Sequence, residues 1–123
     1  MNITSIRGAI TVEQNNRQSI LEATKEMLTS IIGANNLEMS ELVQLHFTCT
    51  KDLDAVYPAV AAREIGIVDA TLMCFQEMYV VGSLQKCIRV DMIVQKDNFS
   101  KKEVKHQYLR EAVRLRPDLI NKE

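Results

Sequence analysis

The stretch from Phe75 to Gln95 reads FQEMYVVGSLQKCIRVDMIVQ. Its second half, Cys87 to Gln95, alternates between apolar and polar side chains, as a half-buried β-strand does. The apolar positions of this alternation are Ile88, Val90, Met92 and Val94. Arg89 therefore belongs to the opposite face of the predicted strand, where it points away from the core.

The first half of the stretch predicts a partner strand from Thr71 to Met78, and the turn residues Gly82–Ser83 predict that the two strands form a β-hairpin. Glu77 then lies on the same sheet as Arg89. The simplest interpretation is an ordinary cross-strand ion pair, which contributes only about 0–1 kcal/mol at an exposed surface. Because strands hold side chains rigidly, the same two groups also suit a ligand site.

Two patterns near the start of the chain predict a strand followed by a helix. Residues 2–12 carry apolar side chains at even positions, with Arg7 on the mixed, odd face. After the cap candidates Asn15–Asn16, apolar residues recur at helical spacing as far as Ile32, and Gly33 with Asn35–Asn36 supplies the stop signals. We expect a long amphipathic helix here.

The middle of the chain predicts a strand and a short helix. Residues 42–49 alternate again, and we expect Val43, Leu45 and Phe47 on one side of this strand. Residues 59–64 follow a proline and are rich in alanine, which favours a short helix.

The motif SKKE, Ser100–Glu103, is a capping-box pattern that predicts a last helix, carrying Tyr108 and closed by Pro117. The element order predicts an α+β fold with a mixed β-sheet packed on one long helix. One helix can cover only one face of such a sheet. The face with Arg7 and Arg89 must therefore meet solvent or a partner subunit, which predicts an oligomer.

Length and composition narrow the function classes. We expect residues 1–123 to form a single domain. A formal net charge of -1 argues against nucleic-acid binding, and no stretch approaches the roughly 20 apolar residues of a membrane span. Cys49, Cys74 and Cys87 are too widely spaced for a disulfide framework or a zinc site. We expect reduced thiols in a cytoplasmic protein.

Further charged and phenolic side chains accompany Glu77 and Arg89; they are Arg7, Arg63, Arg116 and Tyr108. Such a set suits a small ligand with carboxylates and a hydroxyl group. Each member also has an ordinary interpretation, as a solvated helix-end charge or as a core tyrosine with its hydroxyl at the rim. No metal-ligand spacing, Gly-rich phosphate loop or nucleophile elbow is present. Any chemistry should therefore rest on positioning and electrostatics, with no metal or cofactor.

Several motifs resemble, in order and spacing, those of one enzyme family. They are IRGAITVE, YPAVAARE, LMCFQEM followed by KCIRV, and YLREAVRLRPDL. From Ile6 to about Leu119 the chain resembles the small monofunctional chorismate mutases of the AroH class. The resemblance implies a homotrimer with a barrel-like core and active sites between subunits. It also implies conversion of chorismate to prephenate in phenylalanine and tyrosine biosynthesis, by a Claisen-type rearrangement without a cofactor.

The resemblance implies roles for individual residues. Arg89 matches the arginine that contacts the ether oxygen of chorismate, and Arg7 matches the arginine that holds a carboxylate. Glu77 and Cys74 match residues that approach the ring hydroxyl, and Tyr108 matches a tyrosine that contacts the side-chain carboxylate. The matched substrate-binding positions are Tyr57, Ala59, Arg63, Leu72, Met73, Leu115 and Arg116.

Three departures from the family pattern concern the substrate site. Val60 stands where some members carry lysine, Met73 replaces a smaller polar wall residue seen in others, and the tail after Asp118 is short. Two alternative functions stay open at this point. The first is a non-catalytic trimeric module that binds a small carboxylate for regulation, and the second is a hydrolase of the trimeric imine-deaminase type.

Overall fold

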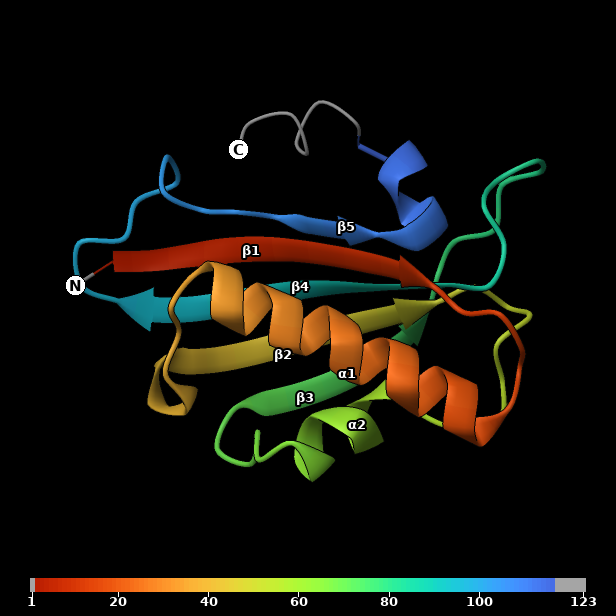
Figure 1. The fold of residues 1–123 in the computed structure, drawn as a ribbon, viewed down its shortest axis with the longest axis horizontal. Helices are drawn as coiled ribbons and strands as arrows, with labels where there is room; N and C mark the ends of the chain where they lie inside the picture. The colour runs from red at the N-terminus through yellow and green to blue at the C-terminus, as the bar shows by residue number, and fades with distance from the viewer. Residues whose placement is uncertain (1, 117–123) are drawn as a thin grey trace.

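The computed structural model describes residues 2–116, which form a mixed five-stranded β-sheet with helices packed on one face (Figure 1). The strands are β1 (Asn2–Thr11), β2 (Leu42–Cys49), β3 (Thr71–Gln76), β4 (Cys87–Lys96) and β5 (Gln107–Leu109). The helices are α1 (Arg17–Ala34) and α2 (Pro58–Glu64), with short 3-10 turns η1 (Met39–Glu41) and η2 (Arg110–Arg114). Pro117 and the tail after Asp118 lie outside the described residues.

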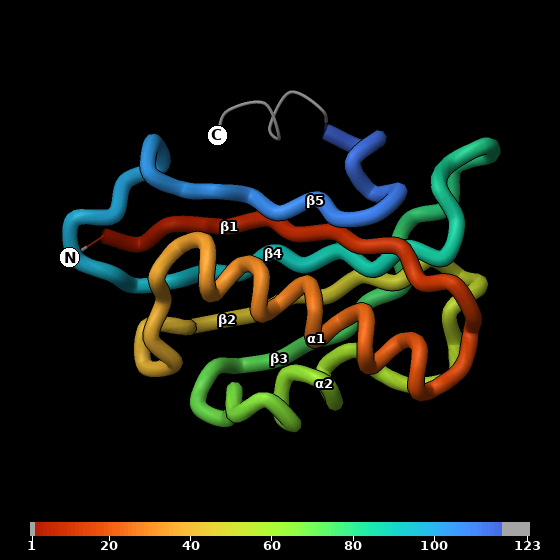
Figure 2. The backbone as a smooth tube through the Cα atoms, in the orientation of Figure 1, coloured from red at the N-terminus to blue at the C-terminus, as the bar shows by residue number. Residues whose placement is uncertain are grey.

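The strand order is β3-β2-β4-β1-β5, which the tube of Figure 2 also follows. Because β2 lies between β3 and β4, the predicted hairpin of these two strands is wrong. β4 pairs antiparallel with β1 and β2, whereas β3 runs parallel to β2 and β5 runs parallel to β1. Alternation identifies a strand but not its neighbour, and here β3 reaches β2 through a crossover that contains α2.

Asparagine side chains anchor α1 at both ends. Asn16 is the N-cap, and its side chain accepts a hydrogen bond from the backbone N–H of Ser19 at 2.8 Å. At the other end, Asn35 Nδ2 donates to the carbonyl of Ile31 at 2.9 Å. The predicted helix is confirmed: it includes Gly33 and ends at Ala34, with Asn35 of the predicted stop signals as its C-cap.

The core lies between α1 and the sheet. Its largest fully buried side chains include Ile6, Ile10, Ile20, Met27, Leu28, Phe47 and Met92. Gly8 of β1 lies directly beneath α1, because a Cβ placed there would come within 2.5 Å of Ile31 Cδ1 and 3.2 Å of Val90 Cγ1. Only glycine fits this close approach without displacing a neighbouring side chain.

The burial of β4 agrees with its alternation, but that of β2 does not agree throughout. The buried positions of β4 include Ile88, Val90, Met92 and Val94, which confirms the prediction. In β2, Leu45 and Phe47 are buried as expected, but Val43 is 43% exposed. The pairing register shifts between Leu42 and Gln44, and this irregularity buries Leu42 while it turns Val43 outward. The prediction for Val43 is therefore wrong.

The segment that begins at Ser100 forms a turn and a strand in place of the predicted last helix. Ser100 and Glu103 do bond to each other as in a capping box, but only a turn follows. Residues 107–109 then pair with β1, which places Tyr108 opposite Ala9. The free edge of β1 offers unpaired backbone groups, and pairing with them overrides the local helix signal.

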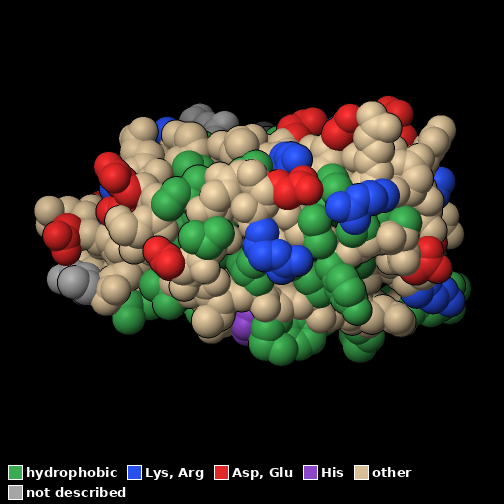
Figure 3. Space-filling view, turned by 90° about the horizontal axis from the view of Figure 1, so that it is seen from below, with side chains coloured by type: hydrophobic (Ala, Val, Ile, Leu, Met, Phe, Trp, Pro, Cys, Tyr) green, Lys and Arg blue, Asp and Glu red, His purple; other side chains and the backbone are tan. Residues whose placement is uncertain are grey.

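α1 and α2 cover one face of the sheet and leave the other face open, as expected (Figure 1). The open face carries exposed hydrophobic side chains, including Ile3, Met73 and Phe75. Seen from the side of β3 and α2, hydrophobic groups also reach the surface among Lys and Arg side chains (Figure 3). None of the helices within residues 2–116 has both the length and the apolar character that a membrane-spanning helix needs. The predicted oligomer stays a prediction.

Candidate active site

Four of the predicted catalytic side chains come together on the open face of the sheet. They are Arg7, Glu77, Arg89 and Tyr108, and they line a hollow of about 390 Å³. The strand register explains this convergence. Arg89 of β4 lies between Thr48 of β2 and Ala9 of β1, and Ala9 lies beside Tyr108 of β5. Since neighbouring residues in a sheet share a face, strands that are distant in sequence deliver these groups to one place.

Glu77 is the acid of this hollow. It follows β3 directly, and its backbone N–H donates to the carbonyl of Cys49 at 2.8 Å, which extends the pairing of β3 with β2. Its Oε1 accepts a hydrogen bond from Thr48 Oγ1 at 2.6 Å and lies 3.5 Å from Arg89 Nη1. The contact with Arg89 is longer than the 2.7–2.9 Å of a tight charge-assisted hydrogen bond. An ordinary ion pair and a ligand site both predict such a contact.

Tyr108 belongs to a small buried cluster, whose other members are Ala9, Cys87 and Ala112. Burial raises the pKa of the Cys87 thiol to about 11, and the nearby Arg89 cation opposes this rise. The thiol is therefore uncharged where it packs beside Tyr108.

A hydrogen bond beside the hollow joins β1 to the segment that leads into β5. The backbone N–H of Arg7 donates to Nδ1 of His106 at 2.9 Å.

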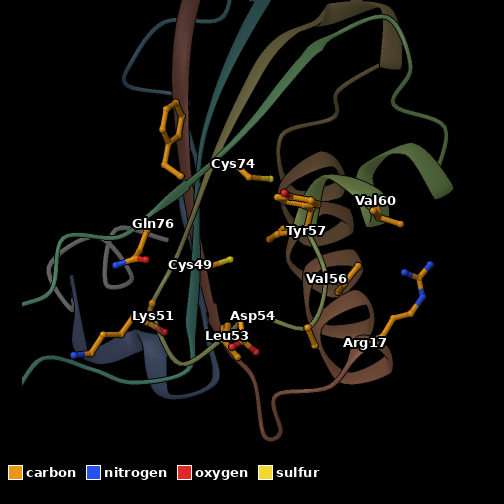
Figure 4. Close-up of a pocket in the computed structure, with 14 residues that line it drawn as sticks. Arg17, Cys49, Lys51, Leu53, Asp54, Val56, Tyr57, Val60, Cys74 and Gln76 are labelled. Carbon is orange, nitrogen blue, oxygen red and sulfur yellow. The ribbon is translucent and has the colours of Figure 1, made fainter.

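A second hollow of about 600 Å³ lies where β3 passes α2 (Figure 4). Tyr57, Val60 and Cys74 line it together with Cys49. Tyr57 is 71% exposed at the start of α2, and its aromatic ring is therefore available to a neighbouring molecule. Burial raises the pKa of the Cys74 thiol, so this group is also neutral near pH 7.

Within one chain, Cys74 does not join Glu77. Side chains alternate along a strand, so Cys74 faces the helices whereas Glu77 reaches the open face. The expectation that both approach the same hydroxyl is therefore not met inside a single subunit.

The remaining predicted binding residues are dispersed. Ala59 is 6% exposed and packs in the core, and Leu72 is partly buried against that core. Met73 is exposed on the open face, and Arg63 is exposed on α2. Leu115 packs against the cluster that contains Tyr108, and Arg116, half-buried, follows it.

Residues 3–119 match the family model described as "Chorismate mutase type I". The chain belongs to this chorismate mutase family. It is 46% identical over 120 residues to Chorismate mutase AroH of Bacillus subtilis (strain 168), covering 97% of this chain and 94% of that protein. It is 45% identical over 118 residues to Chorismate mutase AroH of Thermus thermophilus, covering 95% and 96%. A solved chorismate mutase structure from Clostridium thermocellum matches with a TM-score of 0.86 at 46% identity, over 89% of this chain and 96% of that chain.

These similarities confirm the predicted family and its α+β fold. They also confirm the predicted activity, the conversion of chorismate to prephenate in aromatic amino acid biosynthesis. In the part of this chorismate mutase that the structure describes, no three His, Cys, Asp or Glu side chains gather as a metal site would require.

Other residues of the hollow were not among the predicted site residues. They include His46, Thr48 and Asp91. The alternation in β2 places His46 and Thr48 on its polar side, which was a usable signal. The strand order that brings β2 beside β4 was not contained in that alternation, and without it the two residues had no link to Arg89.

Proposed function

We propose that chorismate binds in the hollow of the open face and rearranges to prephenate there. The observation that carries this proposal is the convergence of two guanidinium groups, one carboxylate and one phenol, which are Arg7, Arg89, Glu77 and Tyr108. Chorismate offers the complementary groups, two carboxylates, a ring hydroxyl and an ether oxygen. Charged groups arranged to match a ligand fix its orientation.

The rearrangement needs electrostatic help more than proton transfer. The ether C–O bond breaks while a new C–C bond forms within the same molecule, so no proton or leaving group passes to the protein. Negative charge grows on the ether oxygen in the transition state. Arg89 stabilises that charge from a fixed position on β4, which lowers the barrier because the interaction is stronger in the transition state than in the ground state.

The other groups hold the substrate in its compact, reactive conformer. Arg7 binds one carboxylate, and the Tyr108 hydroxyl donates to the carboxylate of the side chain. Glu77 accepts a hydrogen bond from the ring hydroxyl. Holding a flexible molecule in this conformer raises the rate, because the entropic cost of ordering it is met on binding and no longer adds to the activation barrier.

The second hollow forms the opposite wall of the site in a neighbouring subunit of a homotrimer. Two features support this arrangement. Tyr57 and Cys74 line a different hollow from Arg89 in their own chain, and the open face exposes hydrophobic side chains that an isolated subunit would leave in water. The binding residues assigned to the assembled site are Tyr57, Ala59, Arg63, Leu72, Met73, Leu115 and Arg116. We place the enzyme in the cytoplasm, in keeping with its free cysteines.

The first test is the loss of chorismate ultraviolet absorbance with purified protein and no added metal or cofactor, with prephenate confirmed as phenylpyruvate after acid treatment. Arg89→Gln should lower kcat by about 100- to 1000-fold, the usual effect of removing one donor to a developing charge. Lys25→Gln is the matched control, because Lys25 forms a surface ion pair with Glu64 on the helical side of the sheet, away from the hollow. Wild-type kcat in the Arg89 variant would refute its role, and binding without turnover would indicate a regulatory module.

Mixed trimers test whether sites lie between subunits. Light scattering should give about three times the 14.0 kDa mass of the chain. Arg89→Gln disables one wall, and Tyr57→Asp places a repelling charge on the other. Co-refolding the two inactive variants should restore turnover, since some interfaces then combine two intact walls. A site contained in one chain would show no such recovery.

A further inference from the structure

We propose that Thr48 is a positioning residue for Glu77, an inference that rests on the proposed function. Its hydroxyl donates to Glu77 Oε1 at 2.6 Å, the shortest described contact of that carboxylate. Both residues line the hollow of the open face, and both are partly buried there. Hydrogen bonds to a charged acceptor are stronger than neutral ones, so this contact fixes the carboxylate.

This contact gives the two carboxylate oxygens of Glu77 different partners. Oε1 receives the Thr48 hydroxyl and faces Arg89 Nη1 at 3.5 Å. Oε2 is thereby left to accept the ring hydroxyl of chorismate. Threonine suits this task because its β-branched side chain has few rotamers, so its hydroxyl is held in one direction.

Thr48 also keeps Glu77 from closing on Arg89. Thr48 is the register neighbour of Arg89 in the pairing of β2 with β4, and its hydroxyl approaches Glu77 Oε1 at 2.6 Å while Arg89 Nη1 remains 3.5 Å from the same oxygen. A carboxylate free to turn would form a closer ion pair with the guanidinium, at the 2.7–2.9 Å typical of such contacts. That pair would occupy one or two of the N–H donors of Arg89 and so compete with the ether oxygen for this guanidinium.

Thr48→Val replaces the hydroxyl with a methyl group of similar size. We expect kcat/KM to fall about 10- to 100-fold, as for the loss of a hydrogen bond to a charged group. Thr48→Ser keeps a hydroxyl and should restore most of the activity. Thr71→Val is the matched control, because Thr71 is exposed at the start of β3 and lies outside the hollow. Urea unfolding should show similar stability for all three variants.

A double-mutant cycle with Glu77→Ala separates positioning from a structural role. If Thr48 acts through Glu77, then Thr48→Val should have little further effect on kcat/KM once the carboxylate is absent. Equal losses in both backgrounds, or wild-type activity in Thr48→Val, would overturn the inference while leaving the proposed function intact. Wild-type activity in Glu77→Ala would instead remove the proposed role of Glu77, and with it this inference.

Discussion

Replacing Gly8 with alanine should destabilise the protein through one identifiable contact. The added Cβ would lie 2.5 Å from Ile31 Cδ1, 3.2 Å from Val90 Cγ1 and 3.3 Å from Met27 Cγ. Overpacking of this kind typically costs about 1–3 kcal/mol. Alanine also restricts the unfolded chain, which offsets about 0.4–1 kcal/mol. We therefore expect a net loss of about 1–2 kcal/mol in the free energy of unfolding.

A second substitution, at Ile31, should relieve the clash. Ile31→Val removes Cδ1, the atom of closest approach, and by itself should cost about 0.5–1.5 kcal/mol. If the clash with Cδ1 is the cause, the double variant should be nearly as stable as Ile31→Val alone. The expected coupling between the two sites then equals the loss caused by Gly8→Ala alone, about 1–2 kcal/mol in favour of the double variant.

Urea unfolding of the four proteins measures this coupling. Protein concentration must be equal throughout, because the stability of an oligomer depends on it, and equal m-values would show that the unfolded states are comparable. Strictly additive losses would refute the reasoning, since they would mean that the space beneath Ile31 does not limit residue 8.

Two further predictions concern a helix cap and a thiol. Asn16→Ala should lower the free energy of unfolding by about 1 kcal/mol, because the backbone N–H of Ser19 loses its acceptor. Asn16→Asp keeps an acceptor oxygen and should retain most of the stability of the unchanged protein. Urea unfolding measures both variants, and equal stability of the two would contradict the capping role. Burial raises the pKa of the Cys49 thiol from its ordinary 9.0 to about 12, so the folded state favours the neutral thiol. Its contribution to stability is complete below pH 9 and is lost as pH rises from there toward 12, because the unfolded chain ionises first. The alkaline decline of the unfolding free energy should be shallower in Cys49→Ala, and an unchanged slope would show that this thiol is not the cause.

The periodic elements of the fold can be predicted from the amino-acid sequence. The helix after Asn16 and the two-sided character of β4 follow from local spacing, which depends only on the geometry of a helix or a strand. The family motifs around Arg7, Glu77 and Arg89 were equally readable, because they are contiguous. The two-faced sheet also followed, since one long helix covers a single face.

The pairing of the strands, in contrast, is known only from the assembled fold. In the sheet, β2 lies between β3 and β4, and residues 107–109 pair with the edge of β1 instead of forming a helix. Val43 points outward because the pairing register shifts beside it. Backbone hydrogen bonding in a sheet joins segments that are distant in sequence, and no local pattern encodes the partner. For the same reason, the contact between Thr48 and Glu77 and the place of Cys74 in the other hollow follow from the strand order and not from any local pattern.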